Sequence, residues 1–332
     1  MRFDRSAALC VAAFSLAASP LVLAKEEAPL KIQNKGALKG ASQIAIAAFN
    51  VGFIFESTDA TKASGGLMGA FGGATKAQSK LVGVTPAMMQ QITDAAYADF
   101  VGQMTARGFT VLAPGAVFGD PGFAKVKAQT GPTDINIALE KGSKGKAVYY
   151  KPSALPKQVI IGTDFVGSGM SSMGLMMSAG QNGYLLGTYA KAANTPVVDV
   201  TYLIDFSQQK RPGAFSFGGL KVNAALSVSP TYSKVTVIGP NGKQDMLTLG
   251  QPVVVEGEFI DMVDASSGFD KTSQAVGNVA GGVAAAMGFG GFGLGKTRKF
   301  EFTAKPGNYE QGATKAASLA NERVSAQLSA MK

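Results

Sequence analysis

The sequence predicts an α+β fold in which two helices pack against a largely antiparallel sheet. Many short segments alternate apolar and polar residues, which is the period of strands with two different faces. Apolar residues at helical spacing, together with capping signals, occur at residues 85–107 and again after Tyr309. The resulting order is strand, helix, strand, then several strands and a final helix. This order favours α+β over the regular strand–helix alternation of an α/β fold.

The first predicted elements are a strand at residues 42–56 and a long helix at residues 85–107. The strand, SQIAIAAFNVGFIFE, is apolar on both faces, so we expect it at the centre of the sheet with both faces covered. Thr85 suits the helix N-cap, Pro86 the first helical position, and Gly108 the residue after the C-cap. The predicted buried face of the helix consists of Met89, Ile92, Ala96, Phe100 and Met104.

Three further strands are predicted in the middle of the chain, at residues 109–115, 158–167 and 196–206. Pro114 and Gly115 end the first of them, and a polar, lysine-rich stretch follows it. Strict alternation in PVVDVTYLIDF predicts one apolar face and one face in contact with water. The apolar face is Val198, Val200, Tyr202, Ile204 and Phe206, and the wet face is Asp199, Thr201 and Asp205.

The last third of the chain predicts more strands and a closing helix. A hairpin at residues 234–249 turns at Asn241-Gly242, because this dipeptide favours tight hairpin turns. The helix begins near Tyr309, with Asn308 and Gln311 placed as a capping pair. Single strands are predicted at 218–229, 252–263 and 298–304. The residues of the first strand that we expect to face inward are Leu220, Val222, Ala224, Leu226 and Val228. The predicted apolar stripe of the closing helix is Ala313, Ala316, Ala320, Val324 and Leu328.

Three segments rich in glycine, alanine and methionine interrupt this pattern, at residues 63–83, 167–187 and 276–295. A connection between strong elements is normally short and polar. Two interpretations remain open: buried small-residue helices packed on the sheet, or inserts that face another copy of the chain or a bilayer. The candidate contact residues are Met170, Met173, Leu175, Met176, Met177, Gly277, Gly281, Gly288 and Gly291.

The N-terminus has the pattern of a secretory signal peptide. Arg2 and Arg5 precede an uncharged apolar stretch that ends in Val22-Leu23-Ala24, with small residues at the −3 and −1 positions. We therefore expect export to the periplasm, the outer membrane or the cell surface, and cleavage after Ala24. Removing residues 1–24 takes away two basic residues and one acid, so the net charge falls from +9 to +8.

Composition excludes several kinds of catalysis. The chain has no histidine and no tryptophan, and its one cysteine, Cys10, lies within the predicted signal peptide. Ser-His-Asp and Cys-His nucleophiles and histidine-ligated zinc are therefore excluded. The lysines are scattered and form no basic stripe, so nucleic acid is not an expected partner. Anionic envelope lipid or polysaccharide, or simply a solvated surface, remain as explanations of the positive charge.

Residues 290–297, GGFGLGKT, match the phosphate-binding pattern G-x-x-x-x-G-K-[ST] through Gly290, Gly295, Lys296 and Thr297. A working phosphate loop leads into a helix whose N-terminus holds the phosphates. Here RKFEFTA follows, and its alternation predicts a strand. We interpret the motif as a chance match in a glycine-rich segment and expect no cofactor.

The acids in EGEFIDMVD are the other candidate site. Glu256 and Glu258 share one side of a predicted strand, with Asp261 and Asp264 nearby. Paired catalytic carboxylates oppose each other across a cleft, and calcium prefers a loop dense in Asp and Asn. The pattern therefore indicates a solvated strand face, and the same interpretation applies to Asp199 and Asp205. No catalytic or metal-binding group is predicted.

Part of the chain resembles the periplasmic domain of the curli secretion channel (CsgG) family and the related TolB N-terminal domain. The resemblance lies in the succession of IAIAAFNV, FVGQMTARGFTVLAPG, QVIIGTDFVGSG and VVDVTYLIDFS, and it covers residues 42–240. It implies an envelope protein that forms rings or other homo-oligomers and acts in export or scaffolding without enzymatic activity. The chain lacks the acylated cysteine that anchors members of that family.

The predicted organisation follows from these features. It comprises a signal peptide (1–24), an extended segment (25–41), a CsgG-like α+β domain (42–240) with inserts at 63–83 and 167–187, and a C-terminal part (241–332) with the glycine-rich segment 276–295. The leading functional hypothesis is an exported, non-enzymatic envelope protein that self-associates, with the outer membrane or other envelope components as further partners. The alternatives are a periplasmic carrier of a lipid or another apolar ligand, whose methionines line the pocket, and a hydrolase that uses scattered carboxylates.

Overall fold

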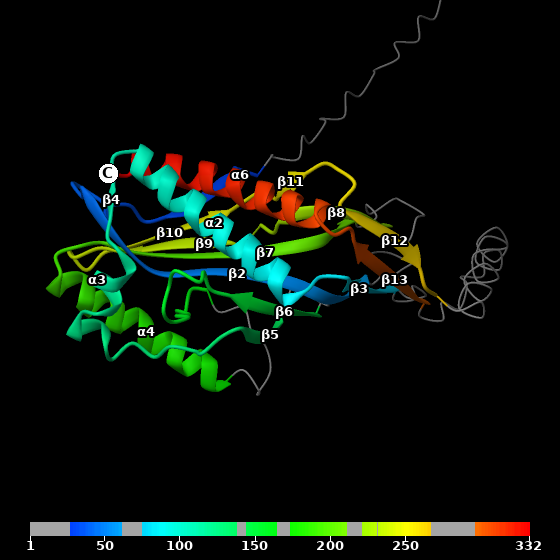
Figure 1. The fold of residues 1–332 in the computed structure, drawn as a ribbon, viewed down its shortest axis with the longest axis horizontal. Helices are drawn as coiled ribbons and strands as arrows, with labels where there is room; N and C mark the ends of the chain where they lie inside the picture. The colour runs from blue at the N-terminus through cyan, green and yellow to red at the C-terminus, as the bar shows by residue number, and fades with distance from the viewer. Residues whose placement is uncertain are drawn as a thin grey trace, which may run out of the picture.

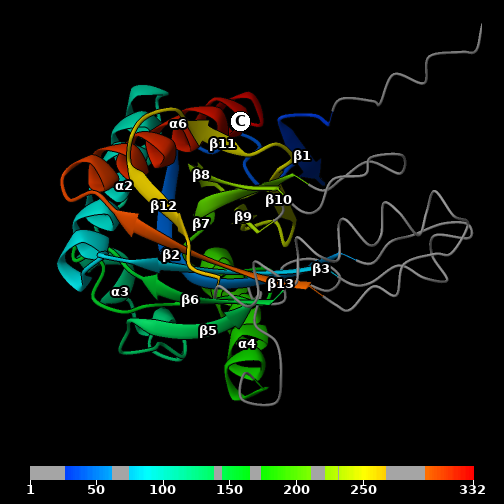
Figure 2. The same cartoon turned by 90° about the vertical axis from the view of Figure 1, so that its right-hand side faces the viewer.

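The computed structural model describes residues 27–61, 75–137, 144–164, 173–210, 221–230, 232–266 and 296–332. Their strands form one 13-stranded, mostly antiparallel sheet with helices on both faces (Figures 1 and 2), which confirms the predicted α+β class. The strands are β1 (Leu30–Gln33), β2 (Gln43–Thr61), β3 (Thr75–Val82), β4 (Thr110–Val111), β5 (Thr133–Ile137), β6 (Lys144–Tyr150), β7 (Val197–Lys210), β8 (Lys221–Val228), β9 (Lys234–Ile238), β10 (Gln244–Leu249), β11 (Val253–Val255), β12 (Ile260–Asp264) and β13 (Lys296–Ala304). The helices are α2 (Pro86–Ala106), α3 (Pro114–Phe118), the 3₁₀ turn η1 (Pro121–Phe123), α4 (Met173–Ala192) and α6 (Asn308–Ala330).

Strand β2 is the centre of the sheet, as its two apolar faces predict. It pairs in parallel with β7, and antiparallel with β6 and β3. Phe49 and Phe53 are fully buried in the main core on one face, and Ala45 and Ala47 are fully buried on the other. The predicted strand at 42–56 is confirmed and continues to Thr61.

Helices α2 and α6 lie side by side on one face of the sheet (Figure 1). Thr85 caps α2 through its side chain, and Gly108 adopts a positive φ of 80° after the helix, both as predicted. The predicted apolar stripes of both helices are buried. The predicted capping pair of α6 is wrong by one residue, because the Glu310 carboxylate accepts the backbone N–H of Gly307.

The opposite face of the sheet is covered by α3, η1, the segment 158–164 and α4 (Figure 1). The strand predicted at 158–167 is wrong over its described residues: it makes one isolated bridge, between Gln158 and Gln129, and then turns at 162–164. Side chains satisfy its backbone in place of a neighbouring strand. Asn50 Nδ2 donates to the Val159 carbonyl at 2.8 Å, and Asn182 Nδ2 donates to the Ile160 carbonyl at 3.0 Å.

This second layer overturns the predicted wet face of β7. Asp199 and Thr201 do alternate with the apolar residues, but both are at most 1 % exposed. Asp205 is largely buried as well, and burial raises its pKa to about 6. Alternation correctly identified the two faces of the strand. The prediction failed at Asp199 because residues 158–164 and α4, which come from elsewhere in the chain, cover that part of the polar face.

Several strands differ from the sequence prediction. Residues 75–82, assigned to a glycine-rich insert, form β3, whose alternation of exposed Lys76, Gln78 and Lys80 with buried neighbours was overlooked. The lysine-rich stretch contains β5 and β6. The strand predicted at 252–263 is split into β11 and β12 around Gly257. Of the strand predicted at 109–115 only β4, Thr110–Val111, forms, and Pro114 begins α3. In β8, Leu226 and Val228 point inward as predicted, whereas Ala224 is exposed.

The hairpin of β9 and β10 is confirmed, with Gly242 at a φ of 78°. The predicted strand after the GGFGLGKT motif is confirmed as well. Lys296 and Thr297 begin β13, which runs parallel to β3, so a strand and not a helix follows these two residues. Gly290 and Gly295 lie outside the described residues, as do the signal peptide and the segment 276–295.

Candidate functional site

Helix α4 is anchored to the sheet by one side. Its buried residues are Ala179, Asn182, Leu186, Tyr189 and Ala190. The Asn182 side chain accepts the Lys127 N–H at 2.8 Å and donates to the carbonyls of Lys127 at 2.7 Å and Ile160 at 3.0 Å. Tyr189 packs edge-on against Phe123 of η1, with ring centroids 5.6 Å apart. These contacts fix which side of the helix faces outward.

The outward side of α4 carries large apolar side chains. Met173 is 50 % exposed, Met176 49 %, Met177 64 % and Tyr184 78 %. Together they make up half of the eight large hydrophobic side chains that are exposed within the described ranges. Exposed apolar residues that occur singly are ordinary, but a concentration on one helix marks a contact surface. We call Met173, Met176, Met177, Gly180 and Tyr184 the α4 face.

The α4 face has no charge and contains exposed glycines. The first charged residue of the helix is Lys191, in its last turn. A Cβ added at Gly174, Gly180 or Gly183 would meet no atom of the described residues within 4 Å. Glycine in a helix interior costs about 0.5–1 kcal/mol relative to alanine. Contacts within the described chain do not require these glycines, and they leave room for another backbone to approach closely.

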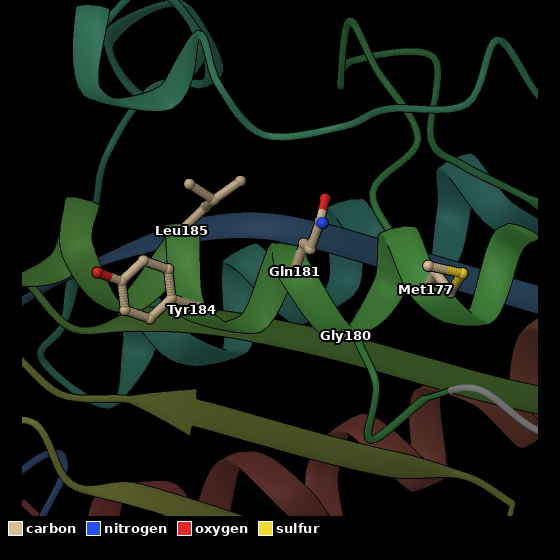
Figure 3. Close-up of a pocket in the computed structure, with 5 residues that line it drawn as sticks. All are labelled: Met177, Gly180, Gln181, Tyr184 and Leu185. Atoms are coloured by element: carbon tan, nitrogen blue, oxygen red, sulfur yellow. The ribbon is translucent and has the colours of Figure 1, made fainter.

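A surface hollow of about 600 Å³ lies on this helix. It is lined by Met177, Gly180, Gln181, Tyr184 and Leu185, all of α4 (Figure 3). Figure 3 shows Gln181 and Leu185 projecting from one side of the helix, with Tyr184 lying along it. The hollow is therefore a depression along a helix. Its volume is within the range of small-molecule sites, which are mostly enclosed by several elements.

The structure brings together some of the predicted contact residues. Met173, Met176 and Met177 share the α4 face, whereas Leu175 is half-buried and packs against the main core. Tyr184, the most exposed of the apolar side chains, was missed, although it lies seven residues after Met177 and thus on the same side of a helix. The remaining predicted residues lie outside the described ranges: Met170, Gly277, Gly281, Gly288 and Gly291.

The carboxylates of EGEFIDMVD are solvated as predicted, but Glu256 and Glu258 lie in the connection between β11 and β12 and do not share a strand face. Glu256, Glu258 and Asp261 are exposed, and the Lys305 ammonium lies 2.9 Å from an Asp261 oxygen. Burial acts to raise the pKa of Asp264, but hydrogen bonds from Ser266 and an ion pair with Arg298 at 2.7 Å outweigh it and lower the pKa to about 2.

Two kinds of feature are absent from the described residues. No group of three or more His, Cys, Asp or Glu side chains there is placed to hold a metal ion. Among the described helices, none is both long and apolar enough to cross a bilayer.

In comparisons with protein-family models, curated proteins and solved structures, none matches this chain. The resemblance to the curli secretion channel family therefore remains a prediction from sequence pattern.

Proposed function

We propose that this chain is an exported, non-enzymatic protein of the cell envelope that self-associates through the α4 face and takes part in surface assembly, export or scaffolding. The observation that carries the proposal is the exposure of Met173, Met176, Met177 and Tyr184 on one uncharged helix face. The signal-peptide pattern of residues 1–24 supports export.

A second copy of the chain is the occupant that best fits the α4 face. An uncharged surface offers nothing to steer or hold a charged partner, so its recognition rests on apolar area and shape. Methionine side chains adapt to irregular surfaces, and exposed tyrosine is typical of contact centres. The exposed glycines at 174 and 180 allow two such helices to approach closely. A helix face that meets its own copy satisfies the symmetry of closed homo-oligomers.

The native mass of the purified chain without residues 1–24 tests this proposal. We expect a discrete oligomer by analytical ultracentrifugation, and monomer for both Met177→Glu and Tyr184→Glu, because each places a charge within the apolar contact. Leu319→Glu is the matched control: Leu319 is 38 % exposed on α6, away from α4, and its replacement should leave the mass unchanged. A wild-type protein that stays monomeric at high concentration, or α4 variants that keep the oligomer mass, would refute the proposal.

The hollow on α4 favours one alternative function, that of a carrier for a lipid or another apolar ligand. Its volume of about 600 Å³ suits such a ligand, and Met177, Tyr184 and Leu185 line it. Native mass spectrometry after gentle purification separates the two functions. A carrier retains a small molecule at the mass of one chain, and Tyr184→Ala releases it. A homo-oligomer shows integer multiples of the bare chain mass.

A further inference from the structure

Two buried carboxyl groups join the sheet to the segment beneath α4. Asp199, on β7, is 0 % exposed and lies between Ala48 of β2 and Thr236 of β9. Asp164 is 1 % exposed, and its carboxyl group accepts the backbone N–H of Ile161 at 3.4 Å. The two carboxyl groups interact electrostatically, and Asp164 Oδ1 and both Asp199 oxygens are buried with no hydrogen-bond partner among the described residues. Because two buried, unpartnered carboxylates would repel each other if both were ionised, at least one of the two is protonated.

The charged surroundings can balance one negative charge. Lys234 of β9 donates to the Thr163 carbonyl at 3.0 Å, and its charge favours ionised Asp164. Tyr149 of β6 is the other titratable group facing the pair; burial, and then the charge of Asp164, raise its pKa. Asn50 and Asn182, from β2 and α4, are neutral. One cation therefore faces two acids, and loss of the remaining proton would place an unbalanced charge in the interior.

The pair lies directly behind the α4 face. The turn that carries Asp164 approaches the helix at Gly180, since a Cβ on Gly162 would lie 3.7 Å from the Gly180 Cα. Asn182 joins α4 to the carbonyl of Ile160 in the same segment, and Thr163 Oγ1 lies 2.9 Å from Thr236 Oγ1 of β9. The segment 158–164 packs under α4. Polar contacts of Asp164, Thr163 and Lys234 thus join this segment to strands β7 and β9.

We propose that Asp164 and Asp199 form a proton-dependent latch, which holds the segment 158–164 and α4 on the sheet while the pair is protonated and loosens both when the pair ionises. This proposal rests on the proposed function, because it assigns a regulation to the α4 face: self-association is supported in acidic conditions and weakened in alkaline conditions.

The direction follows from the ionisation of the pair. Burial raises the pKa of Asp164 to about 6, and burial together with the charge of Asp164 raises the pKa of Asp199. For acids whose pKa is raised by folding, the stabilisation is complete below the unfolded pKa of about 4 and is lost as the pH rises through the folded values. Because the charge of Lys234 balances the first ionisation, the latch opens at the second, whose pKa burial and the charge of Asp164 both raise. The latch therefore holds in acid and opens in alkaline conditions.

Hydrogen–deuterium exchange of the exported chain, corrected for intrinsic exchange rates, tests the latch at about pH 5.5 and about pH 8.5. We expect the protection of α4 and 158–164 to fall roughly tenfold between the two conditions. Asp199→Asn should remove this dependence, since the amide stays neutral at every pH. Asp164→Asn, a second neutral variant, should also remove it, and Asp134→Asn, an exposed strand aspartate on β5, should retain it.

Failure of the latch and failure of self-association give different results. A monomer whose α4 protection falls with pH, and does so only when both acids are present, supports the latch and refutes the association proposal. Equal protection at both pH values, or an unchanged dependence in both Asn variants, overturns the latch. Restoration of protection at alkaline pH by millimolar calcium also overturns it, because the carboxylates would then hold a cation in place of a proton.

Discussion

Replacing Asn321 by alanine tests the polar contact that joins α2 to α6. Asn321 is fully buried among the alanines of α6, and its Nδ2 donates to the Ala96 carbonyl at 2.9 Å and to Asp99 Oδ2 at 2.8 Å. Asp99 also accepts a hydrogen bond from Gln103 Nε2 at 2.8 Å. The two helices lie side by side along this contact (Figure 1).

The expected loss is the sum of two unlike hydrogen bonds. A neutral bond to a carbonyl contributes about 1 kcal/mol, and a bond to a charged carboxylate about 1.5–3 kcal/mol. In the variant Asp99 still accepts the hydrogen bond from Gln103, so the loss of the Asn321 donor does not leave the Asp99 carboxylate unpaired. We therefore expect Asn321→Ala to lower the free energy of unfolding by about 3 kcal/mol. In a double-mutant cycle with Asp99→Ala, the coupling should be about 1.5–3 kcal/mol.

Urea denaturation followed by circular dichroism measures both quantities. The control is Lys315→Ala, an exposed residue of the same helix, which should change stability by no more than about 0.5 kcal/mol. A loss below about 1 kcal/mol for Asn321→Ala, or a coupling near zero, would show that alanine packing alone holds the helices together.

Three further predictions concern the core and its acids. Phe49 lies 5.5–5.9 Å from the rings of Tyr97, Phe100 and Tyr202, so Phe49→Ala should cost about 3–5 kcal/mol in urea denaturation; a loss no larger than that of Phe49→Leu would contradict this. A Cβ at Gly52 would overlap the Tyr149 ring and lie 2.8 Å from Leu203 Cδ1, so Gly52→Ala should lower the free energy of unfolding by about 1–3 kcal/mol. Gly102 lies on the open side of α2, so Gly102→Ala should raise it by about 0.5–1 kcal/mol. Equal effects of the two changes would contradict the packing around Gly52. Burial raises the pKa of Asp205 to about 6, so the wild type should lose stability relative to Asp205→Asn as the pH rises from about 4 to about 6. Thermal unfolding midpoints of the two proteins measure this difference. A difference that is constant with pH would exclude a raised pKa.

Local signals were sufficient for several elements. The cap at Thr85, the glycine at 108 and the spacing of apolar residues determined α2, and Asn241-Gly242 determined the β9–β10 turn. The central position of β2 followed from its two apolar faces. Helical structure in 173–187 and the methionines of its surface were also anticipated, although the direction of that surface was left open.

Other features depended on contacts between distant segments. The segment 158–164 has the composition of a strand, but Asn50 and Asn182 satisfy its carbonyls and no strand forms. Tyr184 is exposed because Asn182 and Leu186 turn the other side of α4 toward the sheet. Asp199 has the polar spacing of a wet face, yet α4 and its preceding segment cover it.

The sequence by itself determined which side chains share a face of each strand and helix, because that depends only on the period of the backbone. Only the tertiary structure decided which of those faces meet water, since coverage depends on segments that fold over them from elsewhere in the chain. For this protein the two levels diverge at the same place: a polar strand face became an interior acid pair, and an apolar helix face was left outside.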